Sequence, residues 1–360
     1  MTVNFIGMIG HRLSSETIAP SGPIFDKPYI TELAQAHEAA GFDRLLVGYW
    51  SDQPDGFLVT ALAGLATSRI GFLLAHRPGF VAPTLAARKL ASLDHLLDGR
   101  LAVHVISGGS DTEQRKDGDY LDHDQRYART DEFLSVLKQV WNAERPFDHQ
   151  GEHYQAQAAF SAIKPLHKAQ LPVYFGGSSA AALAVAGKHA DVFALWGESL
   201  QQTRETIKAV RAEAARHGRQ VSFSVSFRPI LGATEAQAWA RADGILQTAR
   251  ERVEASGPSL APKPQSVGAQ RLMATVAQGE RVDRCLWTGI AKLVGGGHNS
   301  TALVGTPEQV SDALLDYYEL GVTTFLIRGF DPLEDARDYG RELIPLTRAK
   351  IAHRQARESA

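Results

Sequence analysis

The chain has 360 residues, of which 44% are hydrophobic and 22% charged, a composition typical of a folded protein large enough to bury a sizeable core. Its formal net charge is −2 and its Lys and Arg residues are spread evenly, which argues against binding to nucleic acid. One cysteine, Cys285, excludes an intramolecular disulfide framework, and no stretch approaches the roughly 20 apolar residues of a membrane span, so we expect a cytoplasmic protein that contacts no membrane.

Short apolar runs alternate with longer amphipathic segments, the pattern of βα units. The predicted strands cover residues 3–9, 44–50, 70–76, 101–107, 172–177, 191–197, 221–230 and 323–329. The predicted helices cover residues 29–41, 56–67, 83–99, 129–142, 179–190 and 199–218, and another opens at Thr306-Pro307-Glu308. Eight strands with intervening helices predict an α/β protein with a closed (β/α)₈ TIM barrel, which we expect to form a single domain over residues 1–360.

Two segments are too long for this rhythm and are predicted to be insertions at the C-terminal face of the barrel. Residues 109–165 contain a helix, a hairpin around "FDHQGEHYQAQ" and a loop. Residues 255–300 begin rich in proline and end rich in glycine. Because long loops on the active face of a barrel often close over the site, we predict that residues 255–300 form a mobile, lid-like insertion.

The strand ends carry polar, cationic and aromatic residues, and the C-terminal ends of the strands are where TIM barrels place their chemistry. The residues at or just after these ends include His11, Ser107, Trp196, Arg228 and Arg328. These side chains are therefore candidates for substrate or cofactor contacts.

The turn "GGSS", residues 176–179, joins a predicted strand to a predicted helix. Two glycines let the backbone approach a ligand closely, and Ser178 or Ser179 can cap the helix, whose free N–H groups and positive dipole end attract phosphate. An ordinary helix cap preceded by a tight turn is the alternative interpretation. The motif alone does not decide between them.

Four stretches occur in a fixed order along the chain: "HRPGFVAPTLAARKLASLDHLLDGRLAVHVISGGSD", "LDHDQRYARTDEFLSVLKQVW", "PVYFGGSSAAALAVAGKHADVFALWGE" and "NSTALVGTPEQV". Together they resemble the bacterial-luciferase-like flavin monooxygenases, and among these the alkanesulfonate monooxygenases. The resemblance extends over about residues 4–346. It implies the luciferase-like form of the TIM barrel.

The resemblance also implies a chemistry. Reduced FMN is a co-substrate delivered by a separate NAD(P)H-dependent FMN reductase, and with O₂ it cleaves the C–S bond of an organosulfonate to release sulfite and an aldehyde. The protein holds the sulfonate and excludes water. A homodimer or homotetramer is the assembly that the resemblance implies.

Site residues follow from the resemblance position by position. The FMN phosphate is expected at Gly177, Ser178 and Ser179, with His123 and Tyr127 nearby, and the flavin ring over Ser107. This supports the phosphate interpretation of the turn. Tyr127 could alternatively serve only to anchor its helix.

At the substrate end the sequence departs from the alkanesulfonate enzymes. Where those enzymes carry a cysteine after the second strand, this sequence has Gln53 near the matching position, and Gly295 is nearest to the position of a family arginine. After the seventh strand, Ser226-Phe227-Arg228 replaces Arg-x-His, and after the eighth, Phe330-Asp331-Pro332 replaces Tyr-x-His. These changes put simple alkanesulfonates in doubt and favour a hydroxylated or sugar sulfonate such as sulfoquinovose.

We predict that Arg228 and Arg328 hold the sulfonate through charge-assisted hydrogen bonds, assisted by His11, with Trp196 as an apolar wall. The alternatives are that Arg228 pairs with a carboxylate such as Asp331 or Glu198, that Arg328 caps a loop, and that Trp196 is core packing.

No metal site is expected, because the histidines of "DHQGEH" lie in a hairpin without paired carboxylates. Two other functions stay open. One is a flavin monooxygenase with a non-sulfonate substrate, and the other is a barrel that binds a phosphorylated metabolite without redox chemistry.

Overall fold

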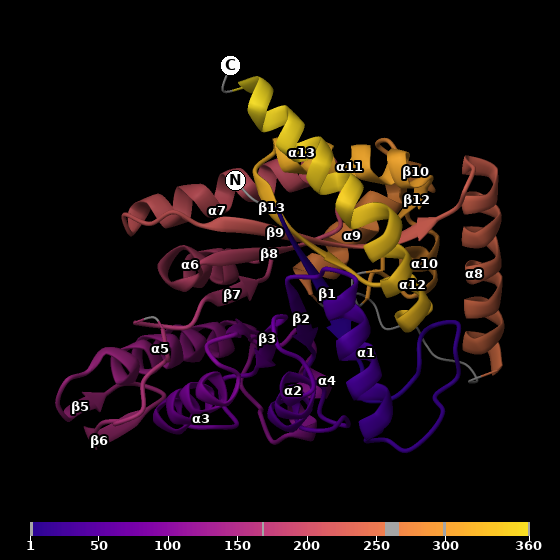
Figure 1. The fold of residues 1–360 in the computed structure, drawn as a ribbon. Coiled ribbons are helices and arrows are strands. Elements are labelled where there is room, and N and C mark those ends of the chain that lie inside the picture. Colours follow the sequence, from indigo (N-terminus) through magenta and orange to yellow (C-terminus); the bar gives the residue numbers. More distant parts are fainter. Residues whose placement is uncertain (1–2, 168, 256–265, 298–299, 359–360) are drawn as a thin grey trace. The chain divides into compact units, whose positions relative to one another are not determined.

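The computed structural model of this protein describes residues 3–167, 169–255, 266–297 and 300–358. Its contacts divide the chain into two compact units. Unit 1 comprises Met1–Leu45, Ala194–Lys208 and Ser222–Ala360, and unit 2 comprises Leu46–Phe193 and Ala209–Val221. Strands β2 (Arg44–Val47) and β8 (Val192–Trp196) and helix α7 (Leu200–Arg216) are each shared between the two units, which are described separately (Figure 1).

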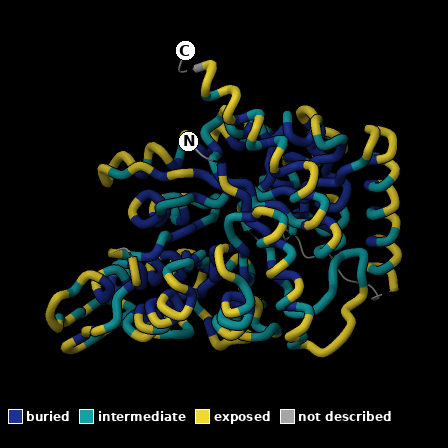
Figure 2. The backbone as a smooth tube through the Cα atoms, in the orientation of Figure 1, coloured by how far each residue is buried: buried dark blue, intermediate teal, exposed yellow. Residues whose placement is uncertain are grey.

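Unit 2 is built of parallel strands alternating with helices. Its further elements are α2 (Gly56–Leu65), β3 (Gly71–His76), α3 (Pro83–Leu96), β4 (Leu101–Val105), α4 (Asp111–Lys116), α5 (His123–Asn142), β5 (Phe147–Gln150), β6 (Gln155–Ala159), β7 (Val173–Gly176) and α6 (Ala180–His189). Strands β3, β4 and β7 pair in parallel, with Ala75 opposite His104 and His104 opposite Tyr174. β5 and β6 form an antiparallel hairpin after α5, with mostly exposed or half-buried residues (Figure 2). The strands therefore end at a common edge, from which the turns into α4 and α6 begin.

Unit 1 has the same strand-and-helix pattern with an added antiparallel hairpin. Its further elements are β1 (Asn4–Ile9), α1 (Lys27–Ala39), β9 (Ser222–Leu231), α8 (Glu235–Ala255), α9 (Val267–Gln278), β10 (Arg281–Val282), β11 (Leu286–Trp287), α10 (Gly289–Leu293), β12 (Ala302–Gly305), α11 (Pro307–Glu319), β13 (Val322–Ile327), α12 (Pro332–Asp338), the π-helix η1 (Tyr339–Leu343) and α13 (Ile344–Glu358). Its strands follow the order β10-β11-β12-β9-β13-β1.

The long strand β9 changes partner along its length. Phe227 lies opposite Ile327 of β13, whereas the next residue, Arg228, lies opposite Ala302 of β12. Because β13 ends at Ile327, Arg328 follows directly after it, and its N–H donates to the carbonyl of Phe227 at 3.3 Å. The strand register thus brings Arg228 and Arg328 to the same place.

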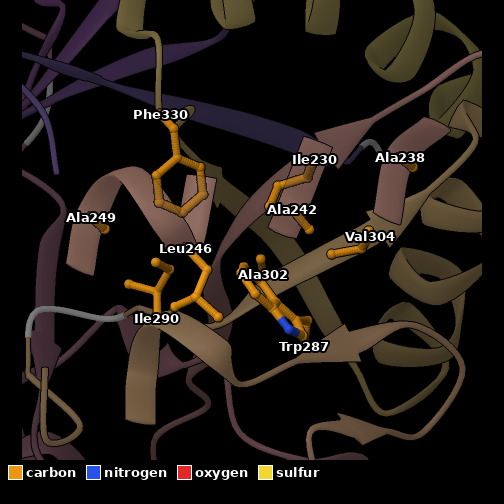
Figure 3. Packing of buried hydrophobic residues seen from close by; sticks show 10 residues of the cluster. All are labelled: Ile230, Ala238, Ala242, Leu246, Ala249, Trp287, Ile290, Ala302, Val304 and Phe330. Atoms are coloured by element: carbon orange, nitrogen blue, oxygen red, sulfur yellow. The ribbon is translucent and has the colours of Figure 1, made fainter. Parts of the chain in front are cut away.

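Helix α8 covers the β9–β12 part of unit 1. Its residues Ala238, Ala242, Leu246 and Ala249, spaced by three or four positions, are buried in one cluster. The cluster also contains Ile230, Trp287, Ile290, Ala302, Val304 and Phe330 (Figure 3). This core fixes the segment that follows β13, because Phe330 belongs to it.

The predicted TIM-barrel fold is confirmed. In the described part of the chain, the eight predicted strands are β1, β2, β3, β4, β7, β8, β9 and β13, and the predicted hairpin is β5–β6. The helix predicted for residues 129–142 is wrong at its start. α5 begins at His123, because Asp122 and Gln125 form a capping box one turn before the apolar pattern becomes clear.

The segment 255–300 is not one long loop. Its described part forms α9, the β10–β11 hairpin and α10. Residues 256–265 and 298–299, on which part of the lid prediction falls, lie outside the described residues. No helix in the described ranges is long and apolar enough to cross a membrane.

Candidate functional site

The turn at residues 176–179 in unit 2 leaves no room for a side chain at its second position. Gly177 has a φ of +141°, and a Cβ there would lie 2.7 Å from the Cβ of Ala182 and 2.8 Å from the hydroxyl oxygen of Tyr127. The backbone at this position therefore requires glycine, both for its conformation and for space.

Ser179 caps α6, and its hydroxyl accepts a hydrogen bond from the N–H of Ala182 at 3.2 Å. The capping interpretation of the turn is thereby confirmed. A cap and an anion site are compatible, because a helix has four unpaired N–H groups at its start and one side chain satisfies only one of them. Binding of phosphate at this turn stays a prediction.

Tyr127 of α5 reaches the same turn. Its ring is 9% exposed, packs edge-on against Phe175 with centroids 6.2 Å apart, and lies 4.8 Å from the ring of His123. Burial raises the pKa of Tyr127, although a hydrogen bond with the hydroxyl of Ser179 and the charge of Arg126 oppose the shift. The phenol is therefore protonated at neutral pH and presents a neutral polar group beside the glycine–serine turn (residues 176–179).

His123 and Ser107 have local partners. His123 is the first residue of α5, half exposed, and its Nδ1 lies 2.7 Å from a carboxylate oxygen of Asp124. Ser107 is buried and its hydroxyl lies 2.9 Å from that of Thr130. Ser178 is half-buried in the glycine–serine turn. Of the predicted cofactor residues, the structure brings together His123, Tyr127, Gly177 and Ser179.

Two side chains that the sequence did not single out support this region. Thr130 donates to the carbonyl of Arg126 at 2.7 Å, so Ser107 is the donor in its contact with Thr130. Gly108, with a φ of +90°, has the side chain of Gln114 where a Cβ would lie. These contacts fix the turn after β4 against α4 and α5.

In unit 1, Arg228 is almost fully enclosed, with 1% of its surface exposed. Its guanidinium lies 3.5 Å from the ring centroid of Phe330, and its Nη2 donates to the carbonyl of Gly329 at 2.9 Å. Its Nη1 lies 2.5 Å from Oε1 of Glu16. Arg228 is thus held on three sides within unit 1.

Arg328 shares the same carboxylate. Its Nη2 lies 3.5 Å from Oε1 of Glu16, its Nη1 lies 3.9 Å from Sδ of Met8, and a quarter of its side chain is exposed. Of the arginine pair, Arg228 and Arg328, the second is the one that solvent reaches.

The charges at this place shift the pKa values of Glu16 and Arg328. Burial opposes the ionisation of Glu16, but the positive charges of Arg228 and Arg328 outweigh it and lower its pKa from 4.5 to about 2. Burial and the charge of Arg228 lower the pKa of Arg328 to about 10, against the effect of Glu16. At neutral pH Glu16 is therefore ionised and Arg328 is protonated.

The sequence missed Glu16 as a partner. The carboxylates considered for Arg228 were Asp331 and Glu198, and both are wrong. Asp331 caps α12 by accepting from the N–H of Glu334, and Glu198 is bound by Arg271 of α9 at 2.7 Å. The available signal was the position of Glu16 in the long loop after the first strand.

His11 and Trp196 take different places in unit 1. His11 is half-buried and lies in the same loop as Glu16, where its carbonyl accepts from the N–H of Asp26 at 2.9 Å. Trp196, half-buried at the end of β8, packs against the start of α9, its ring 3.5 Å from where a Cβ on Gly268 would lie. The structure therefore brings together Arg228 and Arg328, and places His11 on the loop that supplies their counter-ion.

The chain belongs to the luciferase-like monooxygenase family, whose profile matches residues 3–324. This is the family that the four sequence stretches resemble. The family match indicates the general activity, that of a luciferase-like flavin monooxygenase, but it does not identify the substrate.

Solved structures share the fold at low identity. A riboflavin lyase, solved with modified FMN and riboflavin, is 20% identical over 97% of this chain and 92% of its own, with a TM-score of 0.80. An EDTA monooxygenase from Chelativorans sp. BNC1 is 19% identical over 97% and 94%, with a TM-score of 0.77. A coenzyme F420-dependent tetrahydromethanopterin reductase from Methanopyrus kandleri is 16% identical over 96% and 100%, with a TM-score of 0.72. The fold thus serves both flavin and coenzyme F420.

Proposed function

We propose that this protein is the oxygenase of a two-component system that uses reduced FMN and O₂ to cleave the C–S bond of an organosulfonate, releasing sulfite and an aldehyde. A hydroxylated or sugar sulfonate is the preferred substrate class. The observation that carries the proposal is the arginine pair: Arg228 within β9 and Arg328 directly after β13 place two guanidinium groups beside the same carboxylate oxygen.

The glycine–serine turn supports FMN as the cofactor. A phosphate at the start of α6 would accept hydrogen bonds from the backbone N–H groups of the first turn and from the hydroxyls of Ser178 and Tyr127. When bound, reduced FMN supplies the activation of O₂. The contribution of this chain is to bind the phosphate and to keep the cofactor in one orientation.

The arginine pair supports an anionic substrate. Arg328, a quarter exposed, is the group able to meet an incoming anion, while Arg228 holds its position from within. Charge-assisted hydrogen bonds from a planar guanidinium are stronger than neutral ones and fit the tripod of sulfonate oxygens. We therefore assign Arg328 the direct sulfonate contact and Arg228 a supporting one.

One observation favours a second candidate substrate. The anion that lies beside both arginines is a carboxylate, that of Glu16. A carboxylate substrate would suit the same groups, and one relative in fold is an EDTA monooxygenase. The proposed test separates the two, because only a sulfonate releases sulfite.

The test is sulfite release by the protein supplied with reduced FMN and O₂ and a panel of sulfonates that includes sulfo-sugars and matched carboxylates. We expect sulfite from at least one hydroxylated sulfonate. Arg328→Ala should lower kcat/KM by about 10–100-fold, the effect of one lost charge-assisted contact. No sulfite from any sulfonate, with a carboxylate consumed instead, would overturn the assignment.

The separate NAD(P)H-dependent FMN reductase and a homodimer or homotetramer are further parts of this proposal, taken from the resemblance of the sequence to the alkanesulfonate monooxygenases. Turnover that needs an added reductase checks the first. Light scattering of the purified protein checks the second.

A further inference from the structure

The loop between β1 and α1 delivers Glu16 to the arginine pair in a defined conformation. The hydroxyl of Ser15 accepts from the N–H groups of Thr17 and Ile18, each at 3.1 Å, and the hydroxyl of Thr17 donates to the carbonyl of Phe330 at 3.2 Å. The residues on both sides of Glu16 are therefore held by hydrogen bonds, which fix the backbone that positions its carboxylate beside the arginine pair.

The contact between Glu16 and the two arginines is nevertheless incomplete. Oε1 of Glu16 lies 2.5 Å from Nη1 of Arg228 and 3.5 Å from Nη2 of Arg328, and the second distance is too long for a good hydrogen bond. Nε of Arg228 is buried and has no hydrogen-bond partner among the described residues. Arg228 therefore keeps a buried donor that Glu16 does not satisfy.

The two guanidinium groups also share one carboxylate oxygen, Oε1 of Glu16. Their mutual repulsion is evident in the pKa of Arg328, which burial and Arg228 lower to about 10. An oxyanion with three oxygens, such as a sulfonate, has one acceptor for each arginine and one to spare. A carboxylate has two.

We propose that Glu16 is an internal counter-ion that occupies the position of the substrate's oxyanion, and that a substrate binds the arginine pair by displacing it. This inference rests on the proposed function in taking Arg228 and Arg328 as the anion site. Glu16 then sets which anions bind, since an incoming group gains only if it satisfies more donors than the carboxylate it replaces. Sulfonates meet that condition better than carboxylates.

The loop permits such a displacement. Glu16 itself is 28% exposed, and residues 19–24, which follow it, are exposed. Moving the carboxylate outward breaks its two ion pairs and the hydrogen bond from Thr17 to Phe330, but removes no buried apolar side chain from the core. The carboxylate regains its hydration in water, which offsets part of the loss.

The experiment measures anion binding without turnover. Methanesulfonate and inorganic sulfate are titrated into the full-length protein, free of flavin, by calorimetry at pH 7. Glu16→Gln should bind both anions at least about tenfold more tightly than the parent, because the competing charge is gone. Asp316→Asn is the matched control, since Asp316 is 27% exposed and pairs with Arg284 at 3.0 Å. The Asp316→Asn variant should bind both anions with the same affinity as the parent.

Glu16→Asp is a second variant that keeps the charge and therefore the ion pair needed for folding. With a side chain one methylene shorter, it should compete less well and bind methanesulfonate with an affinity between those of the parent and Glu16→Gln. If neither variant binds the anions more tightly than the parent, or if Asp316→Asn gains as much, Glu16 does not occupy the anion position.

Two readouts keep this inference separate from the proposed function. Tighter anion binding by Glu16→Gln in a protein that releases no sulfite from any sulfonate would uphold the role of Glu16 and reject the sulfonate reaction. Sulfite release by the parent, without any gain in anion affinity in Glu16→Gln, would uphold the sulfonate reaction and reject the role of Glu16.

Discussion

The arginine pair of unit 1 and the glycine–serine turn of unit 2 are two ways of preparing a protein for an anion. The first uses full charges, and the structure holds them beside a carboxylate of its own, Glu16. The second uses neutral groups, namely a bare backbone at Gly177, a helix start and the hydroxyls of Ser179 and Tyr127.

The two sites differ in how much they destabilise the folded protein when no ligand is bound. Buried guanidinium groups without a counter-ion would destabilise the fold by several kcal/mol, so Arg228 requires Glu16. Unpaired N–H groups at a half-buried helix start can be hydrated and need no such partner. The charged site should therefore respond strongly to mutation and to acid, and the neutral site mainly to changes in shape.

The largest effect is expected for Arg228→Met. It removes the ion pair with Glu16, the contact with Phe330 and the hydrogen bond to Gly329, and it leaves a carboxylate short of its main partner. Unfolding in urea should show a loss of about 3–5 kcal/mol. Arg284→Met, which breaks a half-exposed pair with Asp316, should cost less than about 1 kcal/mol. Equal losses would mean that Arg228 is not held as described.

The next effect concerns Glu16→Gln and its dependence on pH. Since the folded pKa of Glu16, about 2, lies below its ordinary value of 4.5, the ionised carboxylate stabilises the folded state fully above pH 4.5. That contribution, about 3 kcal/mol, is lost as the pH falls toward 2. The free energies of unfolding of parent and variant should differ by this amount at pH 7 and converge in acid. A constant difference across pH 3–7 would contradict the assignment.

Gly177→Ala should have a smaller effect through shape alone. The new Cβ would lie 2.7 Å from Ala182 on a backbone with a φ of +141°, which should cost about 1–3 kcal/mol and weaken binding of FMN. Gly218→Ala is the control, because Gly218 also has a positive φ, +64°, but nothing lies within 4 Å of its Cβ position. Fluorescence titration with FMN and urea unfolding measure the two effects. If both variants behave alike, the close approach of Tyr127 and Ala182 does not matter.

The smallest effect is expected for Tyr127→Phe, which removes the hydrogen bond with Ser179 and costs about 1 kcal/mol in stability. If this hydroxyl also faces the FMN phosphate, affinity for FMN should fall while affinity for riboflavin, which has no phosphate, stays unchanged. Tyr120→Phe, at a tyrosine that is 76% exposed, should change neither affinity. An equal loss for both ligands would place the hydroxyl away from the phosphate.

The sequence predicted the local features well. The strands, the hairpin after α5 and the cap at Ser179 depend on apolar alternation and on single residues at helix starts, and these signals are present within a few positions of the element they define. The start of α5 at His123 escaped prediction because its capping box is polar and precedes the apolar pattern.

The pairing of side chains was less predictable. The sequence placed Arg228 and Arg328 at strand ends and predicted that they hold a sulfonate. A carboxylate partner for Arg228 was the alternative, with Asp331 and Glu198 as the candidates, whereas the structure has Glu16. Carboxylates near strand ends are common in this chain, and their order along the sequence gives no measure of distance in space.

What the amino-acid sequence determined by itself is the barrel, the glycine that the turn at position 177 requires and the presence of two arginines at strand ends. What only the tertiary structure decided is that one carboxylate serves both arginines. Arg228 and its acceptor Gly329 are 101 positions apart, and their meeting depends on the register of β9 with β13 and on a loop without periodicity that carries Glu16. Short-range patterns encode secondary structure, whereas such a contact is fixed by the packing of the whole unit.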